Sequence, residues 1–201
     1  MVKYITIFVC LAVFAVSLSA QTDNAIFSQT YVFENMRGML SAEILADDFV
    51  PEFSGDVNYV VLWMVHTQGP PANIFLSITK DNGDNNPNTA TPVTSGLSPA
   101  THVDTGTECL GNPVYQTTCT LPSAASVSAG ETYWLEAKMP SFNSFWCAQQ
   151  PLVFGSTMWV YHMDQFVTTM FLYQQEFDSF FELHDLLALE GNSWGAIKAS
   201  F

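Results

Sequence analysis

The sequence predicts an all-β protein built as a sandwich or barrel of short strands. Segments rich in β-branched and aromatic residues recur along the chain, as in "DVNYVVLWMVHT" at 56–67. Proline and glycine separate these segments, as expected for turns between strands. No long segment places apolar residues at helical spacing. With 201 residues, the chain is the right size for one domain with a sizeable core.

The N-terminus, "MVKYITIFVCLAVFAVSLSA", has the pattern of a secretory signal peptide. Lys3 precedes an apolar run from Tyr4 to Val16, and small residues follow. The run is shorter than the roughly 20 residues that a membrane span needs, although an uncleaved anchor is the alternative. We expect residues 1–20 to be removed after Ser19 or Ala20. The remaining chain is then secreted, with no membrane span.

The expected strands follow one another from the N-terminus. Alternating or apolar segments at 25–33 and 44–50 come first, and 56–67 ends before Pro70 and Pro71. In 72–80, Ile74, Leu76 and Ile78 share one face, since side chains alternate along a strand. Later strands are expected at 131–139, 156–163, 166–173 and 179–185.

Three other segments are expected to lie outside strands. The stretch "ITKDNGDNNPNT" at 78–89 contains Asn-Gly after an alternating segment, which is a strong hairpin-turn signal. A cation held weakly by this turn is the alternative. The polar, small residues of 89–108 predict a long loop. Residues 186–201 form a short C-terminal tail, so the folded domain is expected over 21–185.

The charge balance excludes several classes of partner. The chain has 5 Lys and Arg against 19 Asp and Glu, a net charge of −14. Such a chain repels phosphate backbones, so nucleic-acid binding is not expected. Anionic membrane surfaces are disfavoured for the same reason.

Three cysteines remain beyond the signal peptide, and an oxidising compartment favours one disulfide among them. Cys109 and Cys119 flank a turn-containing segment, which predicts that they pair across a hairpin. A bond between Cys119 and Cys147 is the alternative. The spacing matches no zinc motif.

Carboxylates provide one candidate metal site. Asp47 and Asp48 are neighbours on an expected strand, so one of them faces inward, where it needs a hydrogen bond or a cation. Glu182 could join them if the first and last strands pair. The alternative is that Asp47 or Asp48 meets backbone amides. We expect no cofactor, apart from the alternative of a structural calcium ion.

Aromatic residues provide a candidate sugar-binding site. Phe145 and Trp146 lie in "PSFNSFWCAQQP", beside the amides Asn143 and Gln149. Aromatic faces with amide partners bind sugars, because sugar C–H faces are apolar and hydroxyls need hydrogen bonds. The competing interpretation is a strand whose Trp146 fills the core.

The catalytic motifs sought in the sequence do not occur. The four histidines are scattered, without H-E-x-x-H, and there is no G-x-S-x-G. We therefore expect a non-catalytic protein. A hydrolase stays as an alternative, because the carboxylate pair of glycoside hydrolysis is spatial rather than sequential.

Five segments follow one another over about 25–185: "ADDF", a Trp-bearing strand, "KDNGDNNPNT", "SAGETYWLEA" and "FFELHD". Their order resembles exported bacterial β-sandwich domains, of the kind found in PEP-CTERM-type surface proteins. The turn lacks the second glycine of that pattern, and the C-terminus differs from the family's anchor.

That resemblance implies a single antiparallel β-sandwich, jelly-roll-like and similar to carbohydrate-binding modules. It implies a structural or interaction role at or outside the cell surface. The expected partners are an extracellular polysaccharide or a surface-layer protein. A glycan-binding module that uses the aromatics at 145–146 is the alternative.

The signal-peptide interpretation predicts the N-terminus of the exported chain. Expression in a secreting host should release a protein whose N-terminal sequencing starts at Ala20 or Gln21. A cell-associated chain that still begins at Met1 would instead support the uncleaved anchor.

Overall fold

The computed structural model describes residues 25–29, 36–40, 44–138, 143–149, 158–163, 170–175 and 178–185. This described part is all-β, as the sequence predicts, and contains no helix. It also holds no helical segment with the length and hydropathy of a membrane span. Its strands are β1 (Ala25–Gln29), β2 (Met36–Leu40), β3 (Ile44–Phe49), β4 (Gly55–His66), β5 (Asn73–Asp81), β6 (Pro87–Cys109), β7 (Asn112–Val127), β8 (Tyr133–Lys138), β9 (Ser144–Gln149), β10 (Met158–Met163), β11 (Met170–Gln175), β12 (Asp178–Ser179) and β13 (Phe181–His184).

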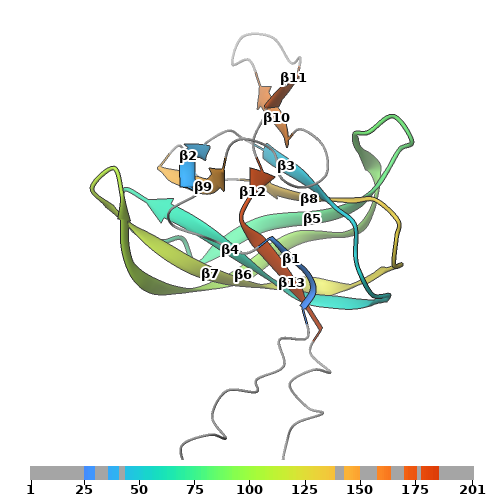
Figure 1. Ribbon diagram of the computed structural model, residues 1–201, viewed down its shortest axis with the longest axis horizontal. Coiled ribbons are helices and arrows are strands. Elements are labelled where there is room, and N and C mark those ends of the chain that lie inside the picture. Colours follow the sequence, from blue (N-terminus) through green and yellow to red (C-terminus); the bar gives the residue numbers. More distant parts are fainter. Residues whose placement is uncertain are drawn as a thin grey trace, which may run out of the picture.

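These strands form one hydrogen-bonded sheet. Its order is β1-β13-β4-β7-β6-β5-β8-β3-β10-β11, and β9 joins as a branch that pairs with β2, β4 and β12. Every recorded strand pair is antiparallel, as predicted. Figure 1 shows β1 and β13 beside each other near the lower edge, with β10 and β11 projecting at the top. The first and last strands, β1 and β13, therefore pair, whereas β3, which carries Asp47 and Asp48, pairs with β8 and β10.

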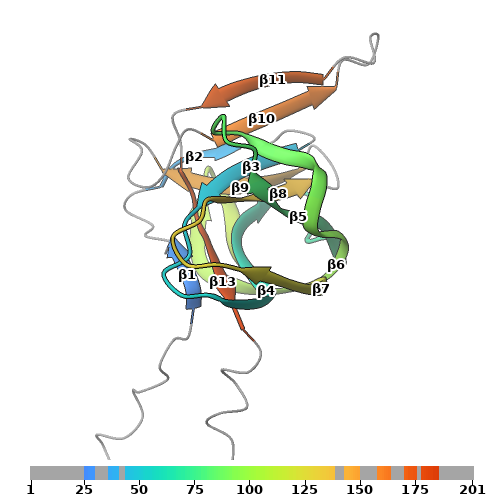
Figure 2. The ribbon, with the colours of Figure 1, turned by 90° about the vertical axis from the view of Figure 1, so that its right-hand side faces the viewer.

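The sheet curls strongly because β6 serves both of its halves. The first part of β6 pairs with β5 as far as Asn73↔Pro99, and the next part pairs with β7 from Ala100↔Cys119 onward. Figure 2 shows β5, β6 and β7 bending around one side of the molecule. The observed fold is therefore one curled antiparallel sheet.

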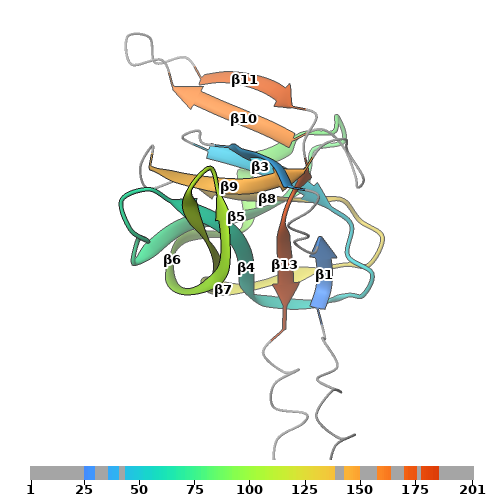
Figure 3. The ribbon, with the colours of Figure 1, turned by 60° about the vertical axis from the view of Figure 1, so that its left-hand side comes forward.

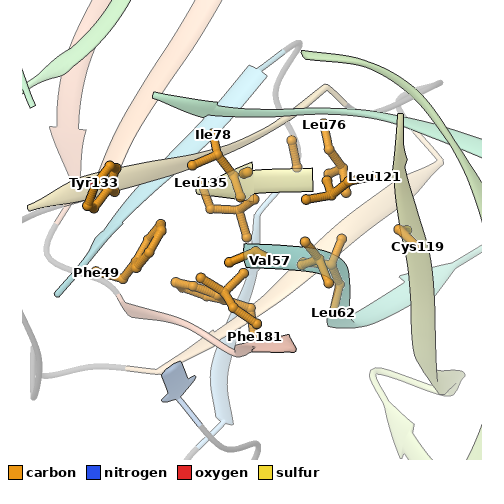
Figure 4. Close-up of a cluster of buried hydrophobic side chains, with 14 of the residues drawn as sticks. Phe49, Val57, Leu62, Leu76, Ile78, Cys119, Leu121, Tyr133, Leu135 and Phe181 are labelled. Carbon is orange, nitrogen blue, oxygen red and sulfur yellow. The ribbon is translucent and has the colours of Figure 1, made fainter. Parts of the chain in front are cut away.

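The inner face of the curled sheet encloses the main core. Figure 4 shows side chains from β3, β4, β5, β7, β8 and β13 meeting there. Alternation sets this face: Leu62 and Met64 of β4 point into it, and Val61, Trp63 and Val65 point away. We call the face that carries this core the inner face and the opposite one the outer face.

A second cluster lies on the outer face, and we call it the outer cluster. Its buried members come from β4, β7, β9 and the residue before β13, and Cys109 and Phe145 pack against it. They are Val61, Trp63, Val65, Val114, Cys147 and Phe180. Figure 3 shows the tip of the β6–β7 hairpin at the same end of the molecule as β9.

The sequence predicted several strands with accurate bounds and misjudged others. The strands expected at 44–50, 56–67, 72–80 and 131–139 correspond to β3, β4, β5 and β8. The long loop expected over 89–108 was wrong, since β6 runs through it. Its threonines and valines suit a strand, and its backbone is paired with β5 along the first part and with β7 along the next. The tail at 186–201 and the signal at 1–20 lie outside the described residues.

The hairpin turn expected at 78–89 is confirmed between β5 and β6. Asp81 Oδ2 accepts the Gly83 N–H at 2.7 Å, and Asn82 Oδ1 accepts the Asp84 N–H at 2.8 Å. Gly83 and Asn85 adopt positive φ values of 93° and 59°, which glycine and asparagine tolerate best. Local turn chemistry therefore accounts for the acidic, amide-rich composition here.

Truncating an inner core residue should cost far more stability than truncating an outer one. Leu135 is fully buried, so Leu135→Ala should lower the free energy of unfolding by about 3 kcal/mol. Val103 is exposed, so Val103→Ala should change it by less than about 0.5 kcal/mol. Urea unfolding of both variants measures the difference, and equal losses would contradict the assignment of the two faces.

Candidate functional site

The sugar-stacking surface expected around Phe145 and Trp146 is not formed. Trp146 is 0% exposed in the main core, and its indole N–H donates to the Phe180 carbonyl at 2.9 Å. Phe145 points to the other face and packs on the outer cluster. The Asn143 carbonyl accepts the Thr67 N–H, and the Gln149 side chain lies outside the described residues. The competing interpretation, a strand with a core tryptophan, is the one observed.

The three carboxylates of the predicted metal site point to different places. Asp47 faces inward and accepts the N–H groups of Ser179 at 2.5 Å and Asp48 at 3.1 Å. Asp48, one residue on, faces outward. Glu182 lies on β13, where it accepts from Ser28 and contacts His184 Nε2 at 3.1 Å.

Backbone amides therefore stabilise Asp47, which is the alternative that the sequence left open. Gln29 Nε2 adds a contact of 3.4 Å to the same carboxylate. Among the described residues, no group of three His, Cys, Asp or Glu side chains is placed to hold a metal ion. A structural calcium ion thus stays a prediction that these contacts do not support.

The predicted Cys109–Cys119 disulfide is incompatible with the observed register. Both cysteines are free thiols, and Cys109 lies directly opposite Asn112 across the hairpin. Cys119 is seven residues further along β7, on the order of 20 Å away at the rise of a strand. A disulfide needs Cα atoms within about 7 Å. The sequence placed the turn midway between the cysteines, whereas it falls at Leu110 and Gly111.

A group of polar rings and hydroxyls, which we call the histidine cluster, lies at one end of the inner face. It was not predicted, because its members come from β4, β6, β7 and β9 and are far apart in the sequence. They are His66, His102, Tyr115, Thr117 and Ser144. His66, Thr117 and Ser144 each share a face with a residue of the main core two positions away, which is Met64, Cys119 and Trp146 in turn.

Hydrogen bonds fix both imidazoles of the histidine cluster. His66 Nδ1 lies 3.0 Å from Ser144 Oγ. His102 Nε2 lies 2.7 Å from the Pro71 carbonyl, which can only accept, so this nitrogen carries a hydrogen. In the neutral ring, His102 Nδ1 then accepts from Thr117 Oγ1 at 2.9 Å. The two rings meet edge to face with their centroids 5.3 Å apart.

His66 is kept neutral by its surroundings. Burial lowers its pKa to about 4, with a smaller contribution from the charge of His102. Its Nε2 atom is buried without a hydrogen-bond partner. A base hydrogen-bonded to a serine could in principle activate it, but His66 and Ser144 are each only 3% exposed. The pair is closed to solvent in this structure, and its hydrogen bond satisfies polar groups at the end of the core.

Glu136 is a buried carboxyl whose pKa is also strongly shifted. It lies on the outer face of β8 and accepts from Thr79 Oγ1 at 3.4 Å. Burial raises its pKa to about 7, and the Thr79 hydrogen bond opposes this only in part. On the same face, Trp134 Nε1 donates to Asp81 Oδ1 at 3.0 Å. This part of the outer face is thus polar but covered.

Among the described residues, an extended line of exposed side chains runs along the outer face of β6, and we call it the β6 row. Its members alternate along the strand, all are exposed, and none is charged: Val93, Ser95, Leu97, Pro99, Thr101 and Val103. Phe75 of β5 lies opposite Leu97, and Thr118 and Gln116 of β7 lie opposite Thr101 and Val103. Ionisable side chains near the row are Lys138, opposite Phe75, Glu136, opposite Ser77, and Asp104, which follows Val103.

The sequence contains a pattern that indicates the β6 row, although the segment 89–108 is expected to be a loop. Apolar and hydroxyl residues occupy every second position from 93 to 103. This period of two is typical of a strand, although Pro92, Gly96 and Pro99 interrupt its usual composition.

Stability should depend on pH through His66 and Glu136 in opposite senses. The lowered pKa of His66 means that stability falls as pH decreases from 6.5 toward 4, because the unfolded chain binds the proton first. The raised pKa of Glu136 means that stability falls as pH increases from 4.5 toward 7. Between pH 4.5 and 6.5 the two contributions oppose each other.

Substituting either His66 or Glu136 should leave the pH dependence of stability that the other residue causes. In Glu136→Gln, the free energy of unfolding should rise with pH across this range by up to about 3 kcal/mol, and in His66→Gln it should fall. Chemical unfolding at pH 4.5, 5.5 and 6.5 measures both slopes. Slopes of the same sign in the two variants would show that one of the two assigned shifts is incorrect.

We compared the chain with protein-family models, curated proteins and solved structures, and found no match in any of them. The resemblance to exported sandwich domains therefore stays a prediction.

Proposed function

We propose that this protein is a secreted, non-catalytic binding module that acts at or outside the cell surface and binds an uncharged polysaccharide through the β6 row. The observation that carries the proposal is the row itself. It is a continuous uncharged face on a chain with a net charge of −14. The proposal keeps the interaction role expected from the sequence and moves the binding surface away from Trp146.

The charge distribution favours a neutral partner. A chain with 19 acidic residues repels polyanions, including acidic polysaccharides and nucleic acids, at any surface that lacks basic residues. The β6 row has no basic member. A cationic partner would gain little there, because the row has no carboxylate either. The row can therefore bind a partner mainly through apolar contacts and through hydrogen bonds of its hydroxyl groups.

The chemistry of the row suits a sugar polymer. Leu97 is 67% exposed and Val103 63%, and hydroxyls of Ser95 and Thr101 lie between and beside such apolar groups. Sugars present apolar C–H faces and hydroxyls that both donate and accept hydrogen bonds. The row from Val93 to Val103 is roughly 30 Å long at the rise of a strand. It can therefore contact several units of an extended chain.

Introducing a charge into the middle of the row should abolish binding without unfolding the protein. In affinity electrophoresis through gels that contain β-glucan, xylan, dextran or hydroxyethylcellulose, the wild-type chain should be retarded by at least one polymer. Leu97→Glu should weaken that interaction by about tenfold or more, which corresponds to about 1.4 kcal/mol. Its stability should change by less than about 0.5 kcal/mol, since Leu97 is mostly exposed.

Leu110→Glu is the matched control. Leu110 is 85% exposed in the β6–β7 turn, so this variant adds the same charge outside the row. It should bind like the wild type. Equal losses in both variants would mean that net charge, and not the row, governs binding. Absence of retardation by every polymer, together with self-association of the wild type that Leu97→Glu abolishes, would replace the polysaccharide with a second copy of the chain.

A further inference from the structure

The positions of the cysteines single out a pair that the sequence did not suggest. Cys119 belongs to the main core on the inner face of β7. Cys147 belongs to the outer cluster, and Cys109 packs against that cluster. The sheet therefore separates Cys119 from Cys147 as well, which removes the second pairing considered from the sequence. Only Cys109 and Cys147 contact the same group of side chains.

The β6–β7 hairpin places Cys109 against the outer cluster, which contains Cys147. Cys109 is the last residue of β6, and the Leu110–Gly111 turn follows it. Val114, just after the turn, is fully buried in the outer cluster together with Cys147, so the hairpin tip packs onto the same surface as β9. Figures 1 and 3 show the tip of this hairpin and β9 at the same end of the molecule.

The ionisation of Cys147 is consistent with this proximity. Burial raises the pKa of the Cys147 thiol above its ordinary value, and the charge of the Cys109 thiolate raises it further. Cys109 is partly exposed, and burial raises its own pKa as well. The Cys119 thiol, whose pKa burial alone raises to about 12, has no such contribution from another cysteine.

We propose that Cys109 and Cys147 form a disulfide bond that ties the tip of the β6–β7 hairpin to β9. This proposal goes beyond the proposed function. It shares with that function only the assumption of export, which takes the chain into an oxidising compartment. Cys119 stays a free thiol within the main core.

The oxidation is a thiol–disulfide exchange with a small or protein disulfide, such as oxidised glutathione. The more exposed Cys109, as a thiolate, attacks one sulfur of that disulfide and releases a thiol. Cys147, after losing its proton, then attacks the Cys109 sulfur and expels the second thiol. Two protein thiols are oxidised to one disulfide while the oxidant is reduced to two thiols. The raised pKa of Cys147 makes the second step slow in the folded chain.

Peptide mapping tests the pairing directly. The full chain is equilibrated in a glutathione buffer that contains mainly the oxidised form, free thiols are alkylated, and the chain is digested without reduction. The expected result is a cross-linked peptide pair that contains Cys109 and Cys147, with Cys119 alkylated. A cross-link that includes Cys119, or alkylation of all three, would overturn the proposal.

Variants add a test that does not depend on digestion. Reduction of the oxidised wild type should lower its melting temperature by about 10 °C, as expected for closing a long loop. Cys109→Ser should melt at the same temperature with and without reductant, whereas Cys119→Ala should keep the shift. Retention of the shift in Cys109→Ser would overturn the pairing. Polysaccharide binding is measured separately with Leu97→Glu, so failure of either proposal is recognised by itself.

Discussion

The exchange of partners along β6 is the constraint on which the rest of the structure depends. Its pairing with β5 ends at Asn73↔Pro99, and its pairing with β7 begins at Ala100↔Cys119. Pro99 has no N–H to donate, so the change of partner falls at a residue that leaves no backbone donor unpaired. Because a single strand serves both halves, the sheet must bend around it. The bend brings β4 and β7 over β5, β8 and β3, and the inner side chains meet in one core.

The curl of the sheet encloses the inner face, and this determines which polar side chains and thiols are buried. The histidine cluster occupies inner positions at one end of the sheet, where its side chains hydrogen-bond to one another and His66 Nε2 is buried without a partner. On the outer face, β9 and its neighbours cover Trp63 and Val65, whereas nothing in the described part of the chain covers the β6 row. In the described part of the chain, the β6 row thus presents hydroxyl and apolar groups to solvent, whereas His66, Cys119 and Cys147 are buried.

The sequence predicted features that depend on local pattern and failed on those that depend on pairing. Alternation and turn residues placed β4, β5 and the 82–86 turn well, because both signals act within a few residues. Strand β6 was taken for a loop, since its prolines and glycines are unusual in strands and only its two neighbours stabilise it. The same limit hid the histidine cluster: His66 and Ser144 become neighbours through the branch of β9 onto β4, which no spacing in the sequence indicates. The cysteine prediction failed for a smaller reason, the position of one turn.

The surface row and the cysteine pair occupy different parts of the same hairpin, and this separation has a physical consequence. The β6 row ends at Val103, and the register between β6 and β7 shifts between Asp104 and Glu108 before Cys109 is reached. Such an irregularity lets the tip beyond it turn toward β9 while the row keeps its regular alternation. A cross-link at the tip would restrict the part of the hairpin that has few strand neighbours, and it would leave the backbone of the row unchanged. The β6 row should therefore bind its partner equally well with and without the Cys109–Cys147 disulfide. Stability against unfolding should be higher when the disulfide is formed.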